Sequence, residues 1–140
     1  VEVSGDVAYV TDLSGGFHMI DVQDPGSPSL LGSGSGANFY YEVTVDGDNA
    51  YLATSRGFLS YDISDPTAVV CLDAIFTMWS TEDVAVVGDR ALVITDGGDF
   101  IVVDTFKNTI LRPDQLQGMA ARITNRHFRV GAGRGGEDPG

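Results

Sequence analysis

Three short apolar runs, each closed by an aspartate, recur at a regular interval along the chain. They span Phe17–Asp21 (FHMID), Phe58–Asp62 (FLSYD) and Phe100–Asp104 (FIVVD), and their closing aspartates stand 41 and 42 residues apart. A mostly apolar run of this length predicts a strand that is buried on both faces. Such regular recurrence indicates a repeat protein, and we expect Phe17, Phe58 and Phe100 to occupy equivalent core positions.

A second motif precedes each run and predicts a β-hairpin. Its copies are residues 1–10, 43–52 and 84–93. In each copy two valines one residue apart lie on one strand face, a Gly-Asp pair supplies the turn, and another apolar strand follows. A polar loop with glycine then leads into the aspartate-closed run.

The segment after each aspartate-closed run predicts a turn and a fourth strand. The closing aspartate is expected to accept backbone N–H hydrogen bonds in the turn, and proline at positions 25 and 66 stops the strand. The fourth strand is predicted at residues 29–32, 68–73 and 108–112. Four antiparallel strands in about 40 residues are typical of a β-propeller blade.

The two motifs resemble those of the LVIVD-repeat family of β-propellers. The pentapeptide that names the family matches Phe100–Asp104 best, and the upstream hairpin motif matches all three copies. The resemblance covers residues 1 to 112. It implies propeller blades and an extracellular or cell-surface location, and it leaves the biochemical activity open.

The repeats divide the chain into three blades and a remainder. The blades are residues 1–42, 43–83 and 84–120; residues 121–130 are interpreted as the start of an eroded fourth blade, and residues 131–140 as a flexible Gly-rich tail. A short helix from Pro113 is the alternative for this region, which Gly118 disfavours. Closed propellers usually have about 4–8 blades. The sequence therefore predicts an all-β piece of a larger propeller, or one completed by another copy, and the start at Val1 indicates that something upstream is missing.

The charge is strongly acidic and unevenly distributed. The formal net charge is −12, only Arg56 and Arg90 are basic before residue 107, and residues 107–140 carry six basic residues. Phosphate backbones bind through Lys and Arg, so nucleic acid is not expected as a partner. No apolar run approaches the ~20 residues of a membrane span, so direct membrane insertion is not expected. The basic end predicts self-association through blade edges.

Aromatic and acidic residues gather in loops that an antiparallel meander brings to one end of the blades. These are the loops between second and third strands and the links between blades, which we call the loop face. Such side chains suit a sugar, a cationic group or a peptide. The alternative is that the aromatic residues pack between neighbouring blades. The candidate ligand-binding residues are Asp12, Tyr40, Glu42, Trp79, Asp83, Asp96 and Asp99.

No motif predicts a catalytic residue, a metal or a cofactor. His18 is expected to be a strand residue with a hydrogen-bond partner, because no Gly-x-Ser-x-Gly elbow accompanies it. Residues 46–49 begin like a calcium loop but occupy a hairpin turn in every repeat. Cys71 is the only cysteine and lies in an apolar strand, so we expect a buried, inert thiol.

The sequence thus favours a noncatalytic propeller segment that acts as a scaffold or binding module of an exported or cell-surface protein. Its loop face would take a protein or a carbohydrate. Two alternatives stay open: a fragment of a propeller hydrolase or lyase whose active residues lie in other blades, and a structural repeat that assembles into an array.

Overall fold

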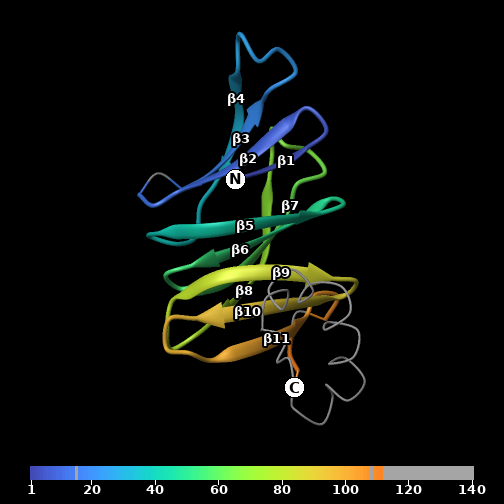
Figure 1. The fold of residues 1–140 in the computed structure, drawn as a ribbon. Helices are drawn as coiled ribbons and strands as arrows, with labels where there is room; N and C mark the ends of the chain where they lie inside the picture. The colour runs from blue at the N-terminus through green and yellow to red at the C-terminus, as the bar shows by residue number, and fades with distance from the viewer. Residues whose placement is uncertain (15, 108, 112–140) are drawn as a thin grey trace, which may run out of the picture. The chain divides into compact units, whose positions relative to one another are not determined.

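The regular structure of the described residues is entirely β. A computed structural model describes residues 1–14, 16–107 and 109–111, which form twelve strands in three four-stranded antiparallel sheets (Figure 1). Within these residues there is no helix, and hence none long and apolar enough to cross a membrane. The strands all belong to one compact unit, Val1–Ile110. The predicted fourth blade and Gly-rich tail lie outside the described residues.

Each sheet is an antiparallel meander that keeps the order of the chain. The first sheet contains β1 (Glu2–Ser4), β2 (Val7–Asp12), β3 (Gly16–Asp21) and β4 (Ser29–Gly34). The second contains β5 (Tyr40–Asp46), β6 (Asn49–Thr54), β7 (Gly57–Asp62) and β8 (Val70–Phe76). The third contains β9 (Thr81–Val87), β10 (Arg90–Thr95), β11 (Phe100–Asp104) and β12 (Thr109–Ile110). This confirms the prediction of three four-stranded blades.

The first hairpin of every sheet turns at a glycine in the left-handed region. Gly5, Gly47 and Gly88 have φ values of 59°, 58° and 60°. A Cβ added at any of them would meet no atom within 4 Å. The backbone conformation, and not lack of space, therefore requires glycine here. This explains the Gly-Asp pair that precedes every second strand.

The closing aspartates act as the sequence predicts. Asp21 accepts a hydrogen bond from the backbone N–H of Gln23 (2.9 Å), and Asp62 accepts one from Ser64 (2.9 Å). Asp104 accepts the equivalent bond from Phe106 at 3.1 Å. Each carboxylate thereby holds the turn that ends its third strand.

Alternate side chains of the second sheet serve two different interfaces. Ala50 and Leu52 of β6 belong to an apolar cluster with Tyr9, Phe17 and Met19 of the first sheet. Their neighbours on the same strand, Tyr51 and Ala53, belong to a second cluster with the third sheet, which contributes Val84, Ala91, Val93 and Val103. Successive strand residues point to opposite faces, so one sheet can pack against a neighbour on each side.

Phe100 departs from the expected equivalence. Phe17 and Phe58 are 0% and 1% exposed, whereas Phe100 is 53% exposed. Phe17 and Phe58 each lie in a cluster shared with the following sheet. No sheet follows the third among the described residues, and Phe100 belongs to neither apolar cluster. The prediction of a core position is right for Phe17 and Phe58 and wrong for Phe100.

Cys71 is also exposed, contrary to the prediction of a buried thiol. It lies on β8, the outermost strand of its sheet, whose residues from Val70 to Asp73 are all exposed. An edge strand has a hydrogen-bonded neighbour on one side only, so its apolar sequence does not guarantee burial. The thiol is nevertheless partly sheltered: it donates to the carbonyl of Asp73 (3.8 Å), and desolvation raises its pKa.

Candidate functional site

The loops and links of the predicted loop face are hydrogen-bonded to one another. In the second sheet, the backbone N–H of Ser55 donates to the carbonyl of Phe39 (3.0 Å). In the third sheet, the N–H of Asp96 donates to the carbonyl of Ser80 at the same distance. Each bond joins the link that enters a sheet to the loop between its second and third strands. The meander therefore brings these segments to one end of each sheet.

Large apolar side chains are exposed on this face. Phe39 lies in the first link, Phe76 ends β8, and Met78 and Trp79 lie in the second link. We call these four residues the aromatic patch. Met78 is 92% exposed, whereas most large apolar side chains in the strand cores are buried. Large apolar side chains that are exposed near one another commonly mark an interaction site.

The loop that carries Ser55 and Arg56 contacts both parts of the aromatic patch, Phe39 and Phe76. Arg56 lies in this loop, between β6 and β7, next to Ser55, whose hydroxyl accepts a hydrogen bond from the N–H of Phe39 (3.2 Å). Its guanidinium lies 5.2 Å from the ring centroid of Phe76 and donates to the carbonyl of Gly36 (3.4 Å). An exposed cation–π contact of this kind is worth about 0.5–1 kcal/mol.

Trp79 packs against the loop that carries two of the candidate acids. A Cβ added at Gly97 would lie 2.5 Å from Cδ1 of the Trp79 indole, so the ring rests directly on that glycine. Gly97 stands between Asp96 and Asp99, both exposed. The structure thus brings Trp79, Asp96 and Asp99 into one region of the loop face, at the end of the third sheet.

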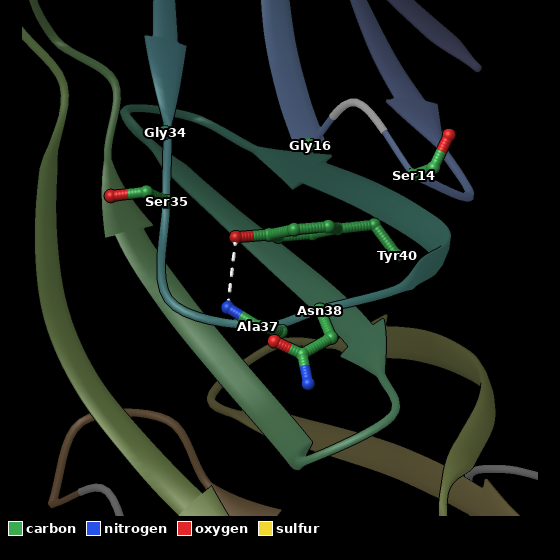
Figure 2. A pocket seen from close by; sticks show the side chains of 7 residues that line it. All are labelled: Ser14, Gly16, Gly34, Ser35, Ala37, Asn38 and Tyr40. Atoms are coloured by element: carbon green, nitrogen blue, oxygen red, sulfur yellow. Dashed lines mark hydrogen bonds between the residues drawn. The ribbon is translucent and has the colours of Figure 1, made fainter.

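Tyr40 is placed differently from Trp79. Its side chain is buried in the cluster between the first and second sheets, as the alternative interpretation expected for the aromatic residues. Its hydroxyl accepts a hydrogen bond from the N–H of Ala37 (3.1 Å) and lines a small pocket of about 110 Å³ (Figure 2). The other lining residues are Ser14, Gly16, Gly34, Ser35, Ala37 and Asn38.

The repeat geometry agrees with a comparison of the sequence with protein families. A family model described as the LVIVD repeat matches residues 1–34 and 41–74. The chain belongs to the LVIVD-repeat family. The third sheet lies outside the matched residues, yet it has the strand order of the first two and the same aspartate-held turn after its third strand. The described structure therefore contains two sheets that match the LVIVD repeat and a third of the same strand order.

A buried threonine connects the second and third sheets, and the sequence did not single it out. Thr81 holds the place in β9 that Tyr40 holds in β5, three residues before the first valine of the hairpin motif. Its hydroxyl accepts a hydrogen bond from the N–H of Thr54 (2.7 Å) and lies 2.8 Å from the carbonyl oxygen of Gly57. Aligning the sequences of the links between sheets could have shown that Thr81 is equivalent to Tyr40. It could not have predicted the hydrogen bonds of Thr81.

The other acids of the LVIVD loop face are engaged locally. Asp12 accepts a hydrogen bond from the N–H of Ser14 (3.2 Å), Glu42 from Val43 (3.2 Å) and Asp83 from Val84 (2.8 Å). Across residues 1–14, 16–107 and 109–111, no three His, Cys, Asp or Glu side chains gather as a metal site. These acids give the loop face negative charge without forming a cation cage.

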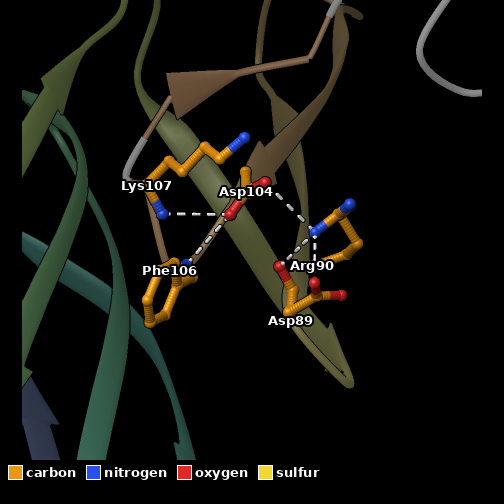
Figure 3. A network of polar contacts seen from close by, with 5 residues as sticks. All are labelled: Asp89, Arg90, Asp104, Phe106 and Lys107. Carbon is orange, nitrogen blue, oxygen red and sulfur yellow. Dashed lines mark hydrogen bonds and ion pairs between the residues drawn. The ribbon is translucent and has the colours of Figure 1, made fainter.

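The third closing aspartate belongs to an ion-pair network in the third sheet (Figure 3). One carboxylate oxygen of Asp104 accepts hydrogen bonds from the N–H groups of Lys107 (3.0 Å) and Phe106, and the other lies 3.3 Å from the Arg90 guanidinium. Arg90 also pairs with exposed Asp89 at 2.8 Å. The hydrogen bond from Lys107, the charge of Arg90 and the remaining contacts hold the pKa of Asp104 below its ordinary value. The network holds a turn.

His18 has the hydrogen-bond partner that the sequence predicts. Its Nδ1 lies 2.8 Å from the hydroxyl oxygen of Ser33, opposite it in the β3–β4 ladder. The pair joins neighbouring strands of the first sheet.

Proposed function

We propose that this LVIVD-repeat chain is a noncatalytic scaffold and binding module of an exported or cell-surface protein. Its loop face holds the partner, and the aromatic patch of Phe39, Phe76, Met78 and Trp79 is the contact surface. The observation that carries the proposal is the exposure of these four side chains beside hydrogen-bonded, ordered loops. Aromatic and methionine side chains are enriched at protein interfaces.

The partner class that suits this surface is a protein segment with apolar and basic side chains. The chain carries a net charge of −12. Glu82 and Asp83 follow Trp79 closely in sequence, and the Trp79 indole rests on the loop that carries Asp96 and Asp99; all four acids are exposed. Negative charge around an apolar contact favours a positively charged partner and disfavours an acidic one. Arg56 already covers part of Phe76 and shows how a cationic group can lie on this patch.

The test is a selection of displayed random peptides against the full chain, followed by binding measurements with the enriched peptides. Trp79 is the only tryptophan in the sequence and belongs to the patch, so its fluorescence reports binding directly. Phe76→Ser and Met78→Ser should each raise the Kd at least about tenfold, which corresponds to the ~1.4 kcal/mol of a strong interface contact. Leu30→Ser is the matched control, because Leu30 is exposed on the outer strand β4 of the first sheet, outside the loop face.

Enriched peptides that bind both patch variants as tightly as the original chain would overturn the proposal. Soluble oligosaccharides provide the second arm. An oligosaccharide that binds with the same dependence on Phe76 and Met78, where no peptide does, would keep the loop face as the site and replace the partner class. Export is tested separately, by locating the protein in fractionated cells of its source.

A further inference from the structure

The indole of Trp79 has one face covered by Gly97 and the other open. A Cβ added at Gly97 would lie 2.5, 2.6 and 2.8 Å from the Cδ1, Cγ and Nε1 atoms of the indole. Because these three distances are so similar, the glycine lies over the face of the five-membered ring and not at its edge. Trp79 is nevertheless 50% exposed. The opposite face of the ring is therefore free for a second contact.

The loop under this ring is held in one conformation by Thr95. The N–H of Thr95 donates to the carbonyl of Asp99 (3.0 Å), and the N–H of Asp99 donates to the hydroxyl of Thr95 (3.1 Å). Gly98, with a φ of 86°, donates to the carbonyl of Thr95 at 3.0 Å. On the side of the link, the hydroxyl of Thr77 donates to the carbonyl of Trp79. An ordered surface of this kind loses little conformational freedom when it binds.

The surroundings of the ring are negatively charged. Asp96 and Asp99 lie in the loop on which the ring rests, and both are exposed. Neither forms a salt bridge with any residue that the structure describes. Arg90 of the third sheet pairs with Asp104, at the opposite end of that sheet. The charge beside the indole is thus complementary to a cationic group.

The second sheet shows which cationic group lies on an aromatic ring of this face. Ser55 and Asp96 donate equivalent backbone hydrogen bonds to the links that enter their sheets, so Arg56 and Gly97 hold equivalent positions in the two loops. The Arg56 guanidinium lies 5.2 Å from the ring centroid of Phe76. The loop of the second sheet therefore supplies its own arginine, whereas the loop of the third sheet supplies a glycine and two carboxylates.

We propose that the open face of the Trp79 indole binds an arginine side chain of the partner, beside the carboxylates of Asp96 and Asp99. The inference rests on the proposed function of the loop face and names the side chain that this part of the face recognises. A guanidinium is planar and stacks on an aromatic ring, and its N–H groups donate to carboxylates beside that ring. An ammonium group lacks the planar surface, so arginine binds here more tightly than lysine.

The experiment titrates the full chain with Nα-acetyl-arginine amide and follows the indole N–H signal of Trp79 by NMR. Trp79 is the only tryptophan in the sequence, so the signal identifies itself. Nα-acetyl-citrulline amide has nearly the same shape without the charge, and Nα-acetyl-lysine amide has the charge without the planar group. The arginine probe should shift the signal to saturation, and each of the other probes should have a Kd at least about threefold higher.

Two double variants of equal net charge test the part that the carboxylates play. Asp96→Asn with Asp99→Asn removes the charges beside the ring and should raise the Kd of the arginine probe at least about threefold. Asp6→Asn with Asp24→Asn is the matched control, because both acids are exposed in turns at the opposite end of the first sheet. The control should leave the Kd unchanged. Thermal unfolding establishes that both variants fold.

Four results would overturn the proposal. The indole signal could fail to shift with saturation, or arginine and citrulline could have the same Kd, which would show that the charge is not recognised. The two double variants could change the Kd equally, which would leave only the long-range attraction of an acidic protein. Equal Kd values for arginine and lysine would overturn the assignment to arginine.

Failure of this inference differs from failure of the proposed function. Peptides that need Phe76 and Met78, but keep their affinity when every arginine is replaced by citrulline, would support the binding module and overturn the arginine site. Saturable binding of the arginine probe that depends on Asp96 and Asp99, in the absence of any enriched peptide, would support the arginine site and count against a peptide partner.

Discussion

The ring centroid of Phe17 lies 5.4 Å from that of Tyr61, with the ring planes inclined at 56°, across the junction of the first and second sheets. The hydroxyl of Tyr61 donates to the carbonyl of Ser35 in the link between these sheets. Burial raises the pKa of Tyr61, so the phenol stays protonated and keeps this bond throughout the pH range of folding. Tyr61 thus stabilises both the apolar core between the two sheets and the link that connects them.

The three repeat phenylalanines should differ in their contribution to stability. Phe17→Ala and Phe58→Ala each remove a fully buried ring and should lower the free energy of unfolding by about 3–5 kcal/mol. Phe100→Ala removes a half-exposed ring and should cost less than about 1 kcal/mol at concentrations where the chain is monomeric. Urea unfolding measures all three. Equal losses of stability in the three variants would contradict the different burial of the three rings. Losses below ~1 kcal/mol in all three would contradict packing through the repeat motif.

The Thr81 hydroxyl should be required for the junction of the second and third sheets. Thr81→Val keeps the shape but leaves the buried N–H of Thr54 without its acceptor, at a cost of about 1–3 kcal/mol, whereas the carbonyl of Gly57 keeps its hydrogen bond from the Thr54 hydroxyl. Thr81→Ser is the control, because it keeps the hydroxyl and loses one methyl group. The prediction fails if urea unfolding gives both variants the same stability.

The Asp104 network should stabilise the fold above the ordinary pKa of aspartate. The folded-state pKa is lowered, so the stabilisation is fully present above about pH 4, the unfolded value. It is lost as the pH falls through the folded-state pKa. Asp104→Asn should therefore be less stable than the original chain at neutral pH, and the difference should shrink in acid. Asp89→Asn is the matched control on exposed Asp89, and its effect should be smaller at every pH, as thermal unfolding can measure.

Cys71 should react slowly with thiol reagents although it is exposed. Desolvation raises its pKa, so less of the reactive thiolate is present at neutral pH than for an ordinary cysteine of pKa about 8.5. We expect the alkylation rate to rise with pH beyond the range in which a small-molecule thiol is already fully reactive, and to rise on unfolding in urea. A rate profile with a midpoint at or below that of the free thiol would contradict the prediction.

The sequence predicts most of the architecture because its signals are local. The alternation of valines, the Gly-Asp turns and the closing aspartates each determine the conformation of a few residues, and the structure contains all three. Strands β4 and β8 end later than predicted, at Gly34 and Phe76, because their pairing with the third strand continues to Phe17 and Gly57 near its start.

The site was less predictable because exposure depends on neighbours. Phe100 and Phe58 are equivalent in the repeat, yet only Phe58 has a following sheet among the described residues. Tyr40 and Trp79 lie in similar aromatic links, but the ring of Tyr40 is turned into the core and Trp79 is half exposed. A repeat period identifies equivalent positions and contains no information about which neighbour covers each of them.

The central place of the second sheet has a consequence for how the protein unfolds. Its strand β6 contributes to both apolar clusters, whereas the first and third sheets each contribute to one. In arrays held by nearest-neighbour contacts, cooperativity is transmitted through the shared unit, and the outer units open at lower free energy. Amide hydrogens of β6 should exchange last, so that this strand reports global unfolding while the outer sheets report local opening.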